Sequence, residues 1–125
     1  MTTTTQQSIS TLLAASEVKA TAVRNLQNQE IGHVDELLIQ LDSGSVRFAV
    51  LSVGGFLGIG STRVAVPWHA FQITQQRDGK LRMVLDATKE RLEHAPRIEG
   101  KNYERLYAAE TAEPIFVYWE IDYVD

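Results

Sequence analysis

Short runs of alternating apolar and polar residues follow one another through the middle of the chain, separated by turn signals. Asp42–Ser43–Gly44 and Arg77–Asp78–Gly79–Lys80 are two such signals, typical of tight β-hairpins. Strand-length runs with hairpin-length turns favour an antiparallel meander, and closing the meander removes the sheet edges on which aggregation starts. We therefore predict a mainly β fold, a small six-stranded antiparallel barrel. Its expected strands are Ala22–Leu26, His33–Leu41, Val46–Val53, Thr62–Val66, Phe71–Thr74 and Leu81–Leu85.

The connection after the third expected strand is rich in glycine and yet apolar. Glycine permits backbone angles that other residues avoid, and connections between strands usually lie on the surface. Large apolar side chains in such a connection either fold back onto the core or present a contact surface to a partner, and both readings stay open. The residues concerned are Gly54, Gly55, Phe56, Leu57, Gly58, Ile59 and Gly60.

The residues after the last expected strand carry the signals of a short helix. Thr88 is a good N-cap, and Glu90 in the first turn suits the positive end of the helix dipole. Leu92 is the expected buried residue, and Pro96 ends the helix. Residues 97–102 look like a linker.

The C-terminal segment allows two interpretations. Residues 103–110 have the spacing of about one and a half helical turns. Between Ile115 and Tyr123 every second residue is Ile, Val, Trp, Ile or Tyr, which is a strand period, although Phe116, Trp119 and Tyr123 also fit one helix face. The enrichment in β-branched and aromatic residues favours a strand, and an aromatic C-terminal extension is expected either way.

Composition narrows the classes of function. The chain has 125 residues, enough for one domain with one core, and a formal charge of −4, which argues against direct binding of nucleic acid. It contains no cysteine, which excludes disulfides and thiolate chemistry and fits a cytoplasmic protein. No basic region precedes the broken apolar patch near Ile9, so we expect neither a signal peptide nor membrane insertion. Residues 1–13 are expected to form a flexible tail.

Two strings in the chain resemble the PRC-barrel family. They are AVLSVGGFLGIG, from Ala49 to Gly60, and VAVPW, which ends at Trp68; the resemblance runs from about Ser16 to Pro96. It implies a barrel over residues 14–96, with residues 97–125 as an extension outside the family pattern. The family includes the cytoplasmic domain of the photosynthetic reaction-centre H subunit, a domain of a ribosome-maturation factor and many small stand-alone bacterial proteins. The resemblance therefore implies a non-catalytic module for protein contacts.

Candidate chemical motifs do not assemble in this sequence. Gly55 to Gly60 has the glycine spacing of a phosphate-binding loop, but Ser61 stands where that motif needs lysine. The three histidines, His33, His69 and His94, lie on separate expected elements without metal-ligand spacing. No serine lies in a nucleophile motif, and Asp35 and Glu36 point to opposite faces of a regular strand. We therefore expect no enzymatic activity, no cofactor and no metal.

The leading hypothesis is a non-enzymatic interaction or scaffold module that forms a homodimer. Alternatives are an accessory factor that binds a ribosomal or RNA-processing protein, and a small-ligand binder at the barrel mouth. The C-terminal stripe, which would be costly if left in water, is expected to cover either its own barrel or that of a second copy. Trp68 is expected to cap the core. The predicted interaction residues are Gly54, Gly55, Phe56, Leu57, Ile59, Trp68, Phe116, Trp119 and Tyr123.

Overall fold

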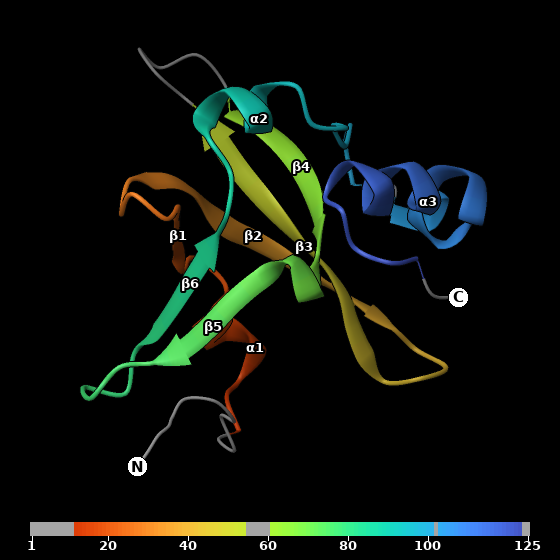
Figure 1. Cartoon of the computed structure of the whole chain (residues 1–125). Helices are drawn as coiled ribbons and strands as arrows, with labels where there is room; N and C mark the ends of the chain where they lie inside the picture. Colours follow the sequence, from red (N-terminus) through yellow and green to blue (C-terminus); the bar gives the residue numbers. More distant parts are fainter. Residues whose placement is uncertain (1–11, 55–60, 102, 124–125) are drawn as a thin grey trace.

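The computed structural model describes residues 12–54, 61–101 and 103–123, and it contains one bent sheet with short helices around it (Figure 1). All six expected strands are present, although their ends differ by a few residues. The strands are β1 (Ala22–Arg24), β2 (Glu30–Gln40), β3 (Ser45–Gly54), β4 (Ser61–Pro67), β5 (Phe71–Gln75) and β6 (Leu81–Leu85). The helices are α1 (Ala15–Val18), α2 (Lys89–Glu93) and α3 (Ala109–Tyr118), with 3-10 helices η3 (Trp68–Ala70) and η4 (Tyr103–Tyr107).

The sheet is mixed and is not closed, so the prediction of a closed, fully antiparallel barrel is wrong in these two respects. The strand order is β4-β3-β2-β1-β6-β5, and β1 pairs with β6 in parallel through Val23 and Met83. The two outer strands, β4 and β5, are joined by a corner instead of a hairpin. Pro67 has no N–H to continue the ladder, and η3 follows it directly. Alternation of apolar residues cannot distinguish a parallel neighbour from an antiparallel one, which is why the sequence missed the β1–β6 pair.

β1 is shorter than predicted because Asn25 begins a turn. Its buried side-chain oxygen Oδ1 accepts hydrogen bonds from the backbone N–H groups of Gln27 and Gln29, at 3.0 and 2.9 Å. Asn28 adopts a φ of 63°, a value that Asn tolerates better than most residues. Asn25 and Leu26 therefore belong to this turn, and the strand ends at Arg24.

The helix predicted after the last strand is confirmed as α2. The hydroxyl oxygen of Thr88 accepts a hydrogen bond from the backbone N–H of Arg91 at 3.0 Å, which is the expected N-cap bond. Leu92 is buried, and the helix ends at Glu93, before Pro96.

The strand favoured for residues 115–123 is wrong, because most of this segment belongs to helix α3 and the turn that ends it. Ala112, Ile115 and Phe116 are buried along one side of the helix, so burial follows the helical period. The helix ends where Glu120 adopts a φ of 59° and the N–H of Ile121 donates to the carbonyl of Phe116 at 3.0 Å. This left-handed stop directs the chain back toward the sheet, so tertiary packing overrides the β propensity of the segment.

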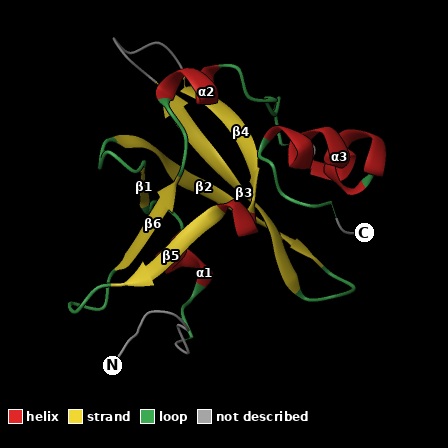
Figure 2. Ribbon diagram, viewed as in Figure 1, coloured by secondary structure: helices red, strands yellow, loops and turns green. Residues whose placement is uncertain are grey.

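Both faces of β3 are buried. The consecutive residues from Phe48 to Val53 are all buried, and so are Val64, Ala65 and Val66 of β4. One face turns toward the inside of the bent sheet, and α3 lies beside β4 on the outside (Figure 2). The ring of Phe116 meets the ring of Phe48 edge-on, with centroids 5.4 Å apart. The C-terminal extension therefore provides part of the core.

Two adjacent residues of α3 test this role of the extension. Phe116 is 6% exposed and Val117 is 68% exposed. Phe116→Ala should lower the free energy of unfolding by about 3–5 kcal/mol, because it removes a large buried ring. Val117→Ala should change it by less than about 0.5 kcal/mol. Urea unfolding followed by circular dichroism measures both variants, and equal small effects would mean that the extension is not part of the core.

Candidate functional site

The predicted interaction residues fall into three groups. Gly54 ends β3 with a φ of 83°, a conformation that favours glycine. Its neighbours Gly55, Phe56, Leu57 and Ile59 lie outside the described residues. Trp68 is half-buried against the core beside Phe71, with ring centroids 6.3 Å apart, so it covers the core partly and is not enclosed by it.

The third group, Phe116, Trp119 and Tyr123, packs against the chain's own sheet. Phe116 and Tyr123 meet edge-on at 5.3 Å, and Trp119 is 6% exposed. In the described part of the chain, the buried indole nitrogen Nε1 of Trp119 has no hydrogen-bond partner. Because the segment is a helix and a turn, Val117 points away from the buried side and the five-residue stripe expected from the strand period does not form. The C-terminal segment was expected to cover either its own barrel or that of a second copy, and in the structure it covers the sheet of its own chain.

Three arginines from three different elements hold the extension against the sheet. The first is Arg47 of β3, whose guanidinium lies over the rings of Phe116 and Tyr123 at 5.1 and 5.4 Å. Its Nη1 also donates to the side-chain oxygen of Gln40 at 3.1 Å. A guanidinium stacked on aromatic rings keeps its charge while covering apolar surface.

Arg63 of β4 holds the residues that precede η4. Its Nε donates to the carboxylate of Asp35 at 2.9 Å, and its two terminal nitrogens donate to the carbonyl of Gly100 and the hydroxyl of Tyr103. Burial lowers the pKa of Arg63, but the hydrogen bonds to Tyr103 and Asp35 raise it by more, so the pKa ends above its ordinary value. The N–H of Ile98 also donates to the carbonyl of Arg63 at 2.9 Å. The segment predicted to be a linker is therefore attached to the sheet.

Arg91 of α2 holds the end of α3. Its guanidinium lies over Tyr118 at 4.7 Å and over Trp119 at 5.3 Å. It also donates to the carbonyl of Tyr118, whose hydroxyl donates back to the carbonyl of Arg91. These contacts have no direct signal in the sequence, because arginines far apart in the chain meet their aromatic partners only in the folded structure.

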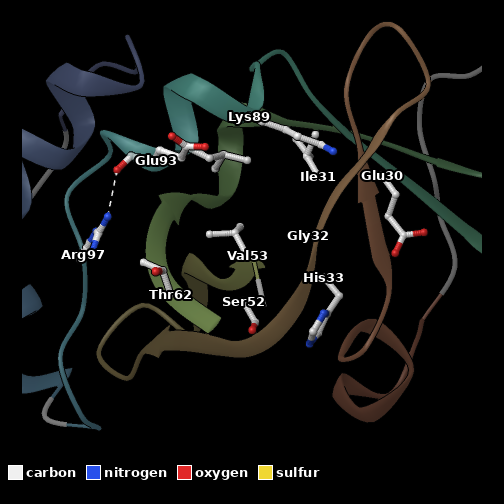
Figure 3. Close-up of a pocket in the computed structure, with 12 residues that line it drawn as sticks. Glu30, Ile31, Gly32, His33, Ser52, Val53, Thr62, Lys89, Glu93 and Arg97 are labelled. Carbon is white, nitrogen blue, oxygen red and sulfur yellow. Dashed lines mark hydrogen bonds between the residues drawn. The ribbon is translucent and has the colours of Figure 1, made fainter. Parts of the chain in front are cut away.

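A pocket of about 340 Å³ opens where β2, β3, β4 and α2 meet (Figure 3). Gly32 lets the strands approach closely here, since a Cβ at this position would lie 2.8 Å from the carbonyl oxygen of Ser52. The lining is mixed in charge and includes Glu30, Glu93, Lys89 and Arg97. Mixed charges around a small apolar floor fit a small polar molecule better than a phosphate or a metal.

The titratable groups are spread over the surface. His33 lies on β2, His69 on η3 and His94 at the end of α2, and all three are exposed. Among residues 12–54, 61–101 and 103–123, no three His, Asp or Glu side chains come together as a metal ion would require.

Three large apolar side chains on or beside the β2–β3 hairpin are exposed, which sequence reasoning missed. Ile39 is 51% exposed, Leu41 90% and Tyr107 71%; we call these three residues the ribbon patch. Two shallow grooves of about 290 Å³ each flank Tyr107, and Arg47 and Gln40 line both. The signal was present in the sequence, because Leu37 to Leu41 contains four large apolar residues in five and so leaves neither strand face polar.

A family model described as PRC-barrel domain matches residues 10–92, which leaves η4 and α3 outside it. No curated protein matches the chain. In the part of the chain that the structure describes, none of the helices has both the length and the apolar character needed to cross a membrane.

The contacts of Arg63 predict how the extension can be released. Arg63→Lys keeps the charge but loses the fork that reaches Asp35, Gly100 and Tyr103 together. We expect a loss of about 1–3 kcal/mol in the free energy of unfolding and faster cleavage by trypsin at Lys101. Trypsin cuts after both Arg and Lys, so the substitution leaves the number of sites unchanged. Arg77→Lys in the exposed β5–β6 turn is the control, and equal cleavage rates in the two variants would contradict the role of Arg63.

Proposed function

The chain belongs to the PRC-barrel family, and we propose that it is a non-enzymatic protein-interaction module of the cytoplasm that associates with a second copy of itself. One observation carries the proposal: in the ribbon patch, Ile39 and Tyr107 are exposed and line one groove, and the exposed Leu41 lies two residues beyond Ile39. An apolar group that leaves water on binding contributes roughly 1.5–3 kcal/mol per large side chain. Contiguous apolar patches on a small protein are typical of contact surfaces.

The surroundings of the ribbon patch also support a protein contact. The grooves beside Tyr107 are shallow and open to solvent, which suits inserted side chains of a partner. Tyrosine and arginine are enriched where proteins meet, because they provide large contact areas with a polar end. Tyr107 and Arg47 supply both types at this place.

The test of self-association is the molecular mass in solution. Light scattering over a range of concentrations should show a monomer–dimer equilibrium for the full chain. The double substitution Ile39→Ser and Leu41→Ser should weaken it at least about tenfold, since two large side chains no longer leave water. Val117→Ser, at a similarly exposed apolar position on α3, should leave it unchanged. A full chain that is monomeric at high micromolar concentration would rule out self-association.

A second candidate function is binding to a basic protein, such as a ribosomal or RNA-processing protein. Residues 1–96 contain nine Lys or Arg and nine Asp or Glu, whereas residues 97–125 contain three and seven. The whole formal charge of −4 therefore belongs to the extension. Glu110, Glu113 and Glu120 are exposed on or next to α3. A localised acidic surface attracts basic partners and repels nucleic acid.

Charge reversal on α3 tests this second candidate. Glu110→Lys with Glu113→Lys should abolish retention of basic proteins from a cell extract at low salt, because the local field changes sign. Wild-type retention should fall as salt rises. Glu30→Lys with Glu36→Lys on β2 is the control of equal charge. If both double variants lose retention equally, net charge alone is responsible and the α3 surface has no specific role.

A further inference from the structure

Among the residues that the structure describes, one side of β2 is unpaired over its second half. β1 pairs with β2 only between Glu30 and His33, and the last backbone bonds on that side join Val34 to Ala20 and Thr21. From Glu36 to Gln40, β2 pairs only with β3 among the described residues. In Figure 1 this part of the hairpin extends as a two-stranded ribbon beyond the rest of the sheet. A strand with one free edge offers unpaired N–H and C=O groups to another strand.

The free edge lacks the features that usually protect such strands. Leu37 to Leu41 contains no charge, no proline and no glycine. The acidic residues before it are already paired, Asp35 with Arg63 at 2.9 Å and Glu36 with Lys19 at 3.4 Å. The β2–β3 pair contains two bulges, one between Val34 and Glu36 and one between Leu38 and Ile39. The extra residue of the second bulge is Arg47 on β3, so β2 itself has no insertion from Glu36 to Gln40.

We infer that two copies of the chain pair through these edges, antiparallel, about a two-fold axis at Leu38. This inference rests on the proposed self-association and gives it a geometry. Such an axis has to pass midway between the two copies of one residue, which then lie directly opposite each other. An axis between neighbouring residue pairs would map a hydrogen-bonded pair onto a non-hydrogen-bonded pair, and these two kinds of pair alternate along an antiparallel ladder. With the axis at Leu38, Leu37 lies opposite Ile39 of the second copy and Glu36 opposite Gln40. The carboxylate of Glu36 in each copy then lies opposite the uncharged Gln40 of the other copy.

The neighbouring registers are less favourable for reasons that the structure gives. An axis at Ile39 places Glu36 opposite Asp42, and like charges directly opposite destabilise a pair of strands. An axis at Leu37 places Gln40 opposite Val34, whose N–H and C=O are already bonded to Thr21 and Ala20. The register at Leu38 avoids both problems.

The area that a stable dimer needs also points to the ribbon patch. A standard interface buries about 800 Å² on each partner. A strand of this length spans only about 20 Å, so the backbone edge alone is too small. The groove of about 290 Å³ beside the edge, lined by Leu38, Ile39 and Tyr107, adds apolar surface in the same place. Edge and groove together form one continuous face for the second copy.

Because the chain has no cysteine, introduced cysteines report this register directly. Paired residues across an antiparallel ladder have Cα atoms about 4.5–5.5 Å apart, within disulfide range. Leu38→Cys should therefore form a covalent dimer under mild oxidation. Glu36→Cys and Gln40→Cys should each fail to do so alone, since each lies about 13 Å from its own copy. A mixture of Glu36→Cys and Gln40→Cys chains should cross-link. Val117→Cys on α3 is the control for random collision.

The outcomes separate the two levels of the proposal. A wild-type dimer whose Leu38→Cys chain and mixed chains cross-link no faster than Val117→Cys overturns the edge register and leaves self-association in place. A monomeric wild type removes both. If Leu38→Cys does not fold, the mixture at the flanking positions decides the register. Hydrogen exchange of the wild type adds an independent measure: alternate amides between Leu37 and Gln40 should gain protection as concentration rises, and unchanged exchange in a dimer overturns the inference.

Discussion

The need to cover both faces of β3 determines the rest of this structure. Six consecutive residues, from Phe48 to Val53, are buried, which is impossible in a sheet that exposes one face to solvent. Bending of the sheet covers one face, and the C-terminal extension contributes to covering the other by placing Phe116 against Phe48. The extension lies outside the matched family region. It is nevertheless integral to the packing of the strands that lie inside that region.

Arginine is well suited to attach this extension. Arg47, Arg63 and Arg91 start from β3, β4 and α2, and each places its guanidinium over aromatic rings of residues 103–123. Aromatic rings provide large apolar areas that have to be covered at their borders with solvent. A guanidinium covers such a border while its N–H groups satisfy backbone carbonyls, as Arg63 and Arg91 do. The acidic side chains among the described residues of the extension are exposed, and one of them, Glu120, pairs with Arg91 at 3.5 Å.

Much of the fold could be predicted from the sequence, because strand periods, turn residues and the Thr88 cap are local signals. The order of the strands and the open edge could not, since Val23 and Met83 meet only through tertiary structure. The C-terminal helix was missed because Ile115 to Tyr123 satisfies a period of two and a period of 3.6 together. Whether this segment forms a strand or a helix depends on the apolar surface of β3 and β4 that the helix covers. Of the predicted interaction residues, Trp68 lies half-buried and Phe116 and Trp119 lie in the core, while the ribbon patch had its signal in Leu37–Leu41.

The parallel pair of β1 and β6 has a consequence for how the chain folds. Val23 and Met83 are sixty residues apart in sequence, and every other strand pair in the sheet joins sequence neighbours. Closing a long loop costs more entropy than closing a hairpin, and contacts of high sequence separation slow folding. The β2–β3–β4 and β5–β6 units can form early from local contacts. The three residues of β1 then join these two units, so the shortest strand in the sheet completes its longest-range connection.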